Sequence, residues 1–299
     1  MENRAGHHLK EKAFPYLMCV PGLLLFTGFV IVPFIIGIGI SFFNWDGRGI
    51  MNPIGVKNYF YAFRDNVFWT AMKNTFLYAI VATLAKNLIG LALALLVAKK
   101  FVGRTLFRIS VFLPVTFSYV VIGVLWSWIY NPDFGLLNNF LSAIGCGGLI
   151  QGWLSDSNIA IFSVIAVDVW KWSGFHMILY LAGIQGINKE YYEAASIDGA
   201  SKWQQFWNIT VPLLNATIVI NILLSITGAF TSNYDIVNIM TGGGPYHSTE
   251  VALTYIVSTG FKLNAFGKSC AMSVILFAFV LVFGIIQVKV MSRDENYDG

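Results

Sequence analysis

The stretch Glu190–Leu214, EYYEAASIDGASKWQQFWNITVPLL, is a mixed polar segment between two long apolar runs, which cover residues 159–184 and 209–232. Each run has the length that a helix needs to cross a bilayer core, about 20 mostly apolar residues. Lipid offers no partner for backbone N–H and C=O groups, so such runs are expected to be helical. The polar stretch is therefore predicted to be a loop at a membrane surface.

The rest of the chain fits a membrane protein. Charged residues make up only 11% of its 299 residues, against about 25% in soluble domains. Four further apolar runs cover residues 14–43, 72–98, 106–130 and 269–290. A barrel would instead show shorter, alternating segments, and the first run is too long for a signal peptide, whose apolar region has about 7–15 residues. The sequence predicts an all-α membrane protein with six transmembrane helices.

The basic residues predict the orientation of these helices. Lysines and arginines gather on the side that holds both termini, which is therefore expected to be cytoplasmic. That side carries Arg4, Lys10, Lys12, Lys99, Lys100, Arg104, Arg108, Lys189, Lys202, Lys289 and Arg293. The other side carries Arg48, Lys57, Arg64, Lys73, Lys262 and Lys268. The net charge of +4 thus reflects topology, and nucleic acid is not an expected partner.

The expected organisation is one membrane domain, residues 14–292, with short cytoplasmic tails at 1–13 and 293–299. Its inner loop at about 185–212 is the only one on that side long enough to fold. The three cysteines, Cys19, Cys146 and Cys270, form no CxxC pair or zinc spacing. The sequence has no GxxxxGK[ST] phosphate loop and no nucleophile–base motif. These features predict neither an enzyme, nor a metal site, nor an ATP site in this chain.

The inner loop has the local chemistry of two short helices. The segment INKEYYEAASI, residues 187–197, favours a helix, and Asp198-Gly199 signals the turn that ends it. Ser201 is a suitable cap for a second helix, and Pro212 suits the first turn of the helix that follows. Small residues and aromatic side chains suit the docking of a partner. A connector lying among the lipid headgroups fits the same residues equally well.

The loop resembles the EAA loop of ABC-importer permeases. In that pattern EAA is followed after three residues by glycine and after nine more by I-x-L-P. Here Glu193-Ala194-Ala195 precede Gly199 and then Ile209-x-Val211-Pro212, with valine in place of leucine. The segments beginning at Asn74, from Phe107 to Asn138 and from Met240 to Thr249 are similar to the carbohydrate-importer branch. Within it, the first permease of maltose-, lactose- and glycerol-phosphate-type systems is most similar, over nearly the whole chain.

This resemblance implies the type I ABC importer permease fold in the cytoplasmic membrane. It implies a second permease, two ATP-binding subunits and an extracytoplasmic solute-binding protein as partners, with ATP bound by the ATPase and no cofactor here. Coupling to the ATPase is then expected from Glu193, Ala194, Ala195, Asp198, Gly199, Ile209 and Pro212.

Three charged residues, Lys86, Asp168 and Lys171, fall inside predicted spans. Such charges are costly in lipid and usually face a pathway or a partner. Asp168 and Lys171 are three residues apart, so they are able to pair on a helix. The alternative is that they lie near the outer interface and extend to it.

Aromatic and polar side chains near these charges predict a sugar path. Rings stack on sugars, and amides and hydroxyls bond to sugar hydroxyls, so we expect a cavity lined by Trp172, Phe175, Phe230, Asn233 and Tyr234. Positions that line the path in similar sugar permeases fall on Lys171, Trp172, Phe175, Phe230 and Asn233. Simple packing of the rings between helices is the alternative.

The predicted function is the membrane-spanning permease subunit of an ATP-driven sugar importer. The alternatives are an ATP-independent secondary transporter or channel, a scaffold protein that uses the loop only to recruit a partner, and an importer of a non-sugar solute such as glycerol phosphate. Neighbouring genes for a binding protein and a second permease would separate these readings. The particular sugar does not follow from the sequence.

Overall fold

The computed structural model describes residues 17–99 and 101–291. The predicted tails, and the basic residues Arg4, Lys10, Lys12, Lys100 and Arg293, lie outside these ranges. The chain forms two compact units. The first comprises the chain up to Asp65 together with Ile256–Ile275, and the second comprises Asn66–Tyr255 and the chain from Leu276.

The first unit begins with an apolar helix, Leu17–Ile40, none of which is buried within the described structure. A short antiparallel hairpin follows, in which Phe43 faces Pro53. Asn58 fixes this hairpin, because its side-chain amide donates hydrogen bonds to the carbonyls of Ser41 (2.9 Å) and Phe43 (2.8 Å). The elements of this unit are η1 (Thr27–Ile31), α2 (Val32–Ile40), β1 (Phe43–Asn44), β2 (Asn52–Pro53), α3 (Lys57–Phe63) and η4 (Ser258–Lys262).

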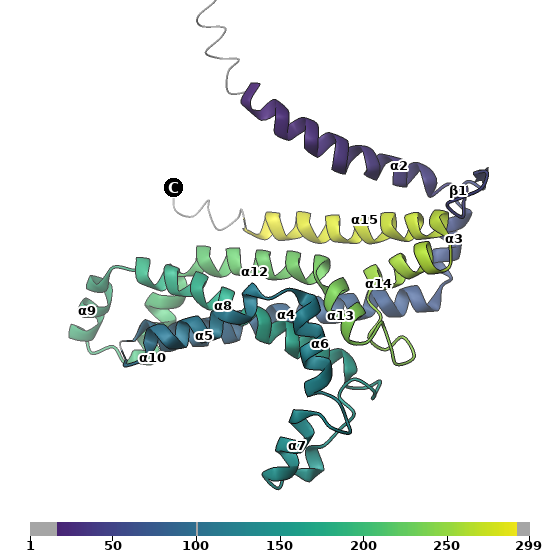
Figure 1. Cartoon of the computed structure of the whole chain (residues 1–299). Coiled ribbons are helices and arrows are strands. Elements are labelled where there is room, and N and C mark those ends of the chain that lie inside the picture. Colours follow the sequence, from purple (N-terminus) through teal and green to yellow (C-terminus); the bar gives the residue numbers. More distant parts are fainter. Residues whose placement is uncertain (1–16, 100, 292–299) are drawn as a thin grey trace, which may run out of the picture. The chain divides into compact units, whose positions relative to one another are not determined.

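The second unit contains the other helices (Figure 1). They are α4 (Asn66–Ala98), α5 (Arg104–Thr116), α6 (Tyr119–Ile129), α7 (Leu136–Ala143), η2 (Gly147–Leu149), α8 (Ala160–Gly186), α9 (Lys189–Ile197), α10 (Lys202–Gln205), η3 (Phe206–Thr210), α11 (Val211–Leu213), α12 (Asn215–Thr231) and α13 (Asn233–Met240). Helix α14 (Ala252–Val257) ends in the first unit, and α15 (Phe266–Met291) begins there.

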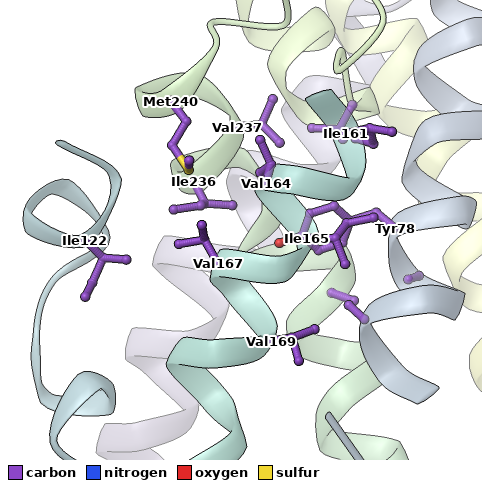
Figure 2. Packing of buried hydrophobic residues seen from close by; sticks show 14 of the residues in the cluster. Tyr78, Ile122, Ile161, Val164, Ile165, Val167, Val169, Ile236, Val237 and Met240 are labelled. Carbon is purple, nitrogen blue, oxygen red and sulfur yellow. The ribbon is translucent and has the colours of Figure 1, made fainter. Parts of the chain in front are cut away.

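The core of the second unit is built around α8, which packs against α4, α5 and α12. Figure 2 shows Val164 and Val167 of α8 between Tyr78 of α4 and Ile236 of α13. Small residues allow close approach of membrane helices. A Cβ at Gly174 would lie 2.2 Å from the carbonyl oxygen of Val111, so α5 and α8 touch at backbone distance.

The third apolar run does not form the single continuous helix expected over residues 106–130. Helices α5 and α6 meet at an angle of 104°. Pro114 lies near the end of α5 and lacks the N–H of a regular turn. Ser118 then starts the new helix, because its hydroxyl accepts a hydrogen bond from the N–H of Val121. The predicted run is therefore helical on both sides of a break at residues 117–118, and the bent pair is long and apolar enough to count as one span.

The fifth run is also bent, by 67° between Leu213 and Asn215. All six predicted runs are mainly helical where the structure describes them, apart from their ends and the breaks in the third and fifth runs. By length and composition, three helices in the described ranges are able to cross a membrane, or five if each bent pair counts as one span. Helix α8 is 27 residues long and carries the buried charges Asp168 and Lys171.

Candidate functional site

A buried ion pair joins α4 to α8. Lys86 Nζ contacts Asp168 Oδ2, and the two side chains are 4% and 3% exposed. Tyr119, the first residue of α6, donates its hydroxyl to Asp168 Oδ1 at 3.0 Å. The spacing of Asp168 and Lys171 allowed those two residues to pair, but the ion pair that Asp168 makes here is with Lys86. Both charged groups are removed from water. Each charge is therefore stabilised mainly by the opposite charge of its partner.

Lys171 instead forms hydrogen bonds with the backbone at the break between α5 and α6. Its ammonium group donates to the carbonyls of Pro114 (3.1 Å), Val115 (3.1 Å) and Phe117 (2.6 Å). The last carbonyls of a helix lack partners within the helix, and a cation is favoured there. Lys86, Asp168 and Lys171 are all buried within the protein, so protein groups and not solvent surround their charges.

A cavity of about 230 Å³, with polar groups among apolar walls, lies beside the ion pair. Trp172 and Phe175, which sequence reasoning proposed for the sugar path, both line it. Their rings meet edge to face at 5.6 Å, and the Trp172 ring N–H donates to the Tyr119 hydroxyl at 2.6 Å. The other lining residues are Lys86, Tyr119, His176, Leu224, Ser225, Gly228 and Ser232.

Hydrogen bonds between helices shape one wall of this cavity. His176 of α8 bonds to Asn221 (2.8 Å) and to Ser225 (3.2 Å), both on α12. Asn87 of α4 donates to the same Ser225 hydroxyl at 3.0 Å and accepts from Tyr180. Polar side chains join membrane helices in this way. The wall is therefore a connected network from three helices.

The remaining candidates, Phe230, Asn233 and Tyr234, are not among the residues that line this cavity. The ring of Phe230 packs against that of Phe76, with the ring centroids 5.6 Å apart, and it lines a separate apolar pocket. Asn233 is 1% exposed, and neither of its amide atoms has a partner in the described ranges. Tyr234 is half-buried. Roles for these residues in the substrate path stay predictions.

Sequence reasoning missed most of the polar lining. No sequence motif marks the polar lining residues Tyr119, His176, Ser225 and Ser232. Whether each one lines the cavity depends on the rotation of its helix about the helix axis. Lys86 had a signal, because a lysine within an apolar run is unusual.

The inner loop has the predicted form of a helix, a turn and a second helix (elbow, residues 188–213). Asn188 caps α9, and Gly199 makes the turn with a φ of 81°. Ser201 and Gln204 form a reciprocal capping box at the start of α10. Gln205 is buried and donates to the Ser196 hydroxyl (2.9 Å) and the Ala200 carbonyl (3.2 Å). These bonds make the elbow a rigid unit.

One face of the elbow is open. Glu193, Ala194, Asp198, Gly199 and Pro212 are exposed, and Ala195 and Ile209 are half-buried. The aromatic residues form a surface cluster, in which Trp203 is 68% exposed, Trp207 is 51% exposed, and Phe206 contacts both. Exposed aromatic side chains on a rigid support are typical anchors for a protein partner.

The fold and site define a helical membrane protein that has a small cavity beside a buried ion pair and a helix–turn–helix elbow with exposed aromatic side chains. Within the described ranges, no group of three His, Cys, Asp or Glu side chains is placed to hold a metal ion. Residues 86–293 match the family described as the binding-protein-dependent transport system inner membrane component. The chain belongs to this family. It is a membrane-spanning permease subunit of an ABC importer, a transport component and not an enzyme.

Similar proteins match nearly the whole length of this chain. It is 38% identical to the probable ABC transporter permease protein YurN of Bacillus subtilis (strain 168), covering 96% of this chain and 99% of YurN. It is 32% identical to the trehalose/maltose transport system permease protein MalF of Thermococcus litoralis, with 97% and 98% covered.

A solved structure has the same fold. A chain of a bacterial ABC transporter that imports the acidic polysaccharide alginate superposes with a TM-score of 0.84 and 25% identity, covering 97% of this chain and 99% of that one. The alginate transporter in complex with its pentasaccharide-bound periplasmic protein gives 0.82 and 26% identity, covering 95% of this chain and 96% of that one.

Proposed function

We propose that this permease imports a sugar without net charge, and that the cavity beside Lys86 and Asp168 is on its path. The carrying observation is the lining itself. Trp172 and Phe175 offer ring surface, and Tyr119, Ser225 and Ser232 offer hydroxyl groups. A few convergent polar groups among apolar walls are typical of small-molecule sites.

The charges around the cavity support an uncharged solute. Lys86 lines the cavity, but Asp168 neutralises it. Lys171 directs its charge to carbonyl groups at the helix break. The described lining therefore has no unpaired charge for a phosphate or carboxylate. The name of the Thermococcus litoralis relative, a trehalose/maltose permease, agrees with this proposal.

The partners in this proposal are a second permease, two ATP-binding subunits and an extracytoplasmic solute-binding protein. ATP is bound by the ATPase subunits, and this chain needs no cofactor. Both termini are cytoplasmic, which places the elbow on the ATPase side. Closure of the ATPases moves the two elbows together, and the rigid elbow transmits the motion through Pro212 to α12. Glu193 pairs with or hydrogen-bonds to the ATPase.

The test is solute-stimulated ATP hydrolysis by the whole complex in proteoliposomes. The complex is given its binding protein and a panel of neutral oligosaccharides, a uronate oligosaccharide and sn-glycerol-3-phosphate. We expect one neutral sugar to stimulate hydrolysis and to be taken up. Stimulation by an anionic solute alone would overturn the proposal, as would uptake that needs no ATP.

A further inference from the structure

A second cavity lies on a different side of α8 from the sugar site. It is an open groove of about 750 Å³ between α4, α5 and α8. Its α4 wall is the row Val81, Ala85, Ile89 and Leu93, and its other walls include Phe107 and Phe162. Ile89 is 42% exposed and Phe162 is 48% exposed. An open apolar groove on a membrane-spanning unit is filled by lipid or by another protein.

The groove has the length of one acyl chain. Val81 to Leu93 extends about 18 Å along the helix, at a rise of about 1.5 Å per residue. One leaflet is about half of the roughly 30 Å hydrocarbon core. A chain lying in the groove would therefore reach from the middle of the bilayer to its surface.

Two arginines continue the groove at one end. Phe107, Val111 and Pro114 of α5 line it, and Arg104 precedes Phe107 by one turn on the same face, with Arg108 beside it. The Nε atoms of both arginines are buried and have no hydrogen-bond partner in the described ranges. Leu93 lies at the same end of the groove, near the end of α4. The two arginines, whose Nε donors lack partners in the described ranges, therefore lie at the end of the groove that the headgroup of a bound lipid would occupy.

From this arrangement we infer a binding site for one anionic phospholipid. An acyl chain fills the groove along α4, and Arg104 and Arg108 bind the headgroup phosphate. Arginine binds phosphate through paired N–H donors, which suits the unpartnered Nε atoms. An apolar transmembrane helix from a partner would fill the groove but would leave these donors without an acceptor. The charge at the groove's end therefore favours lipid.

The test uses native mass spectrometry of the complete transporter, delipidated in detergent and titrated with lipids of identical chains. We expect phosphatidylglycerol to bind at least tenfold more tightly than phosphatidylcholine. Arg104→Gln with Arg108→Gln should reduce phosphatidylglycerol binding at least tenfold. The control pair Arg48→Gln with Lys57→Gln, which lies outside the groove, should not change it. Equal binding of the two lipids, or binding that survives the arginine changes, would overturn the site.

A second comparison tests the groove itself. Ile89→Trp fills it, whereas Leu88→Trp adds the same bulk at the next position, which lines a different pocket. We expect only Ile89→Trp to weaken phosphatidylglycerol binding, by at least fivefold. Equal effects of the two tryptophans would contradict the assignment. A cross-link from Ile89→Cys to the second permease in the delipidated complex would show a protein occupant and would also overturn it.

Discussion

At the scale of single residues, the membrane-buried charges have separate tasks. Lys86 and Asp168 satisfy each other, and Tyr119 adds a hydrogen bond. Lys171 satisfies carbonyls that the broken helix leaves open. A buried pair tolerates neutralisation of both partners better than loss of one.

This asymmetry gives a stability prediction. Lys86→Met leaves the Asp168 carboxylate buried without its cation, which costs about 3–5 kcal/mol. We expect a clear fall in the thermal unfolding midpoint of the assembled transporter. Lys86→Met combined with Asp168→Asn removes both charges and should recover at least half of the loss. The outcome that would contradict this is simple additivity. If Asp168→Asn lowers the unfolding midpoint of Lys86→Met by as much as it lowers that of the unchanged protein, the two side chains do not interact as described.

At the scale of elements, local chemistry predicted the elbow better than the spans. The capping and turn roles of Asn188, Gly199 and Ser201 involve only neighbours a few positions away in the chain. These roles can therefore be predicted from the sequence. The break between α5 and α6 did not follow, because the run around Pro114 is apolar throughout. The Lys86–Asp168 contact joins residues 82 positions apart, and the i, i+3 spacing of Asp168 and Lys171 suggested a nearer partner. The cavity lining depends on helix rotation, which composition does not determine.

The glycine of the elbow gives a prediction about coupling. Gly199 has a φ of 81°, and a Cβ there would meet no other atom, so a substitution acts through backbone strain alone. Valine disfavours positive φ, whereas asparagine tolerates it. Gly199→Val should therefore abolish sugar-stimulated ATP hydrolysis in the reconstituted complex, and Gly199→Asn should keep most of it.

Gly186→Val is the matched control for this prediction. Gly186 also has open space around it but does not have a positive φ. We expect coupling close to that of the unchanged protein. Equal coupling in Gly199→Val and Gly186→Val would show that the turn does not transmit the signal.

At the scale of the whole molecule, the asymmetry of basic residues sets the proposed topology. Two exposed positions in the second unit test it: Val102 in the turn between α4 and α5, and Tyr246 after α13, which is 96% exposed. In a chain whose native cysteines are replaced by alanine, Tyr246→Cys should react with an impermeant thiol reagent on intact cells. Val102→Cys should react only after permeabilisation. The reverse pattern would invert the topology and separate the elbow from the ATPase.

The central claim is that sugar passes along the cavity beside Lys86 and Asp168. Helix α8 offers a matched pair of tryptophans for its test, because Trp172 lines this cavity and Trp170 lines the groove on another side. The measurement is ATP-driven uptake of the stimulating sugar by the full complex in proteoliposomes, with pull-down of the ATPase confirming assembly. Trp172→Ala should reduce uptake at least tenfold, equal to about 1.4 kcal/mol, and Trp170→Ala should change it less than twofold. Normal uptake by an assembled Trp172→Ala transporter would contradict the account.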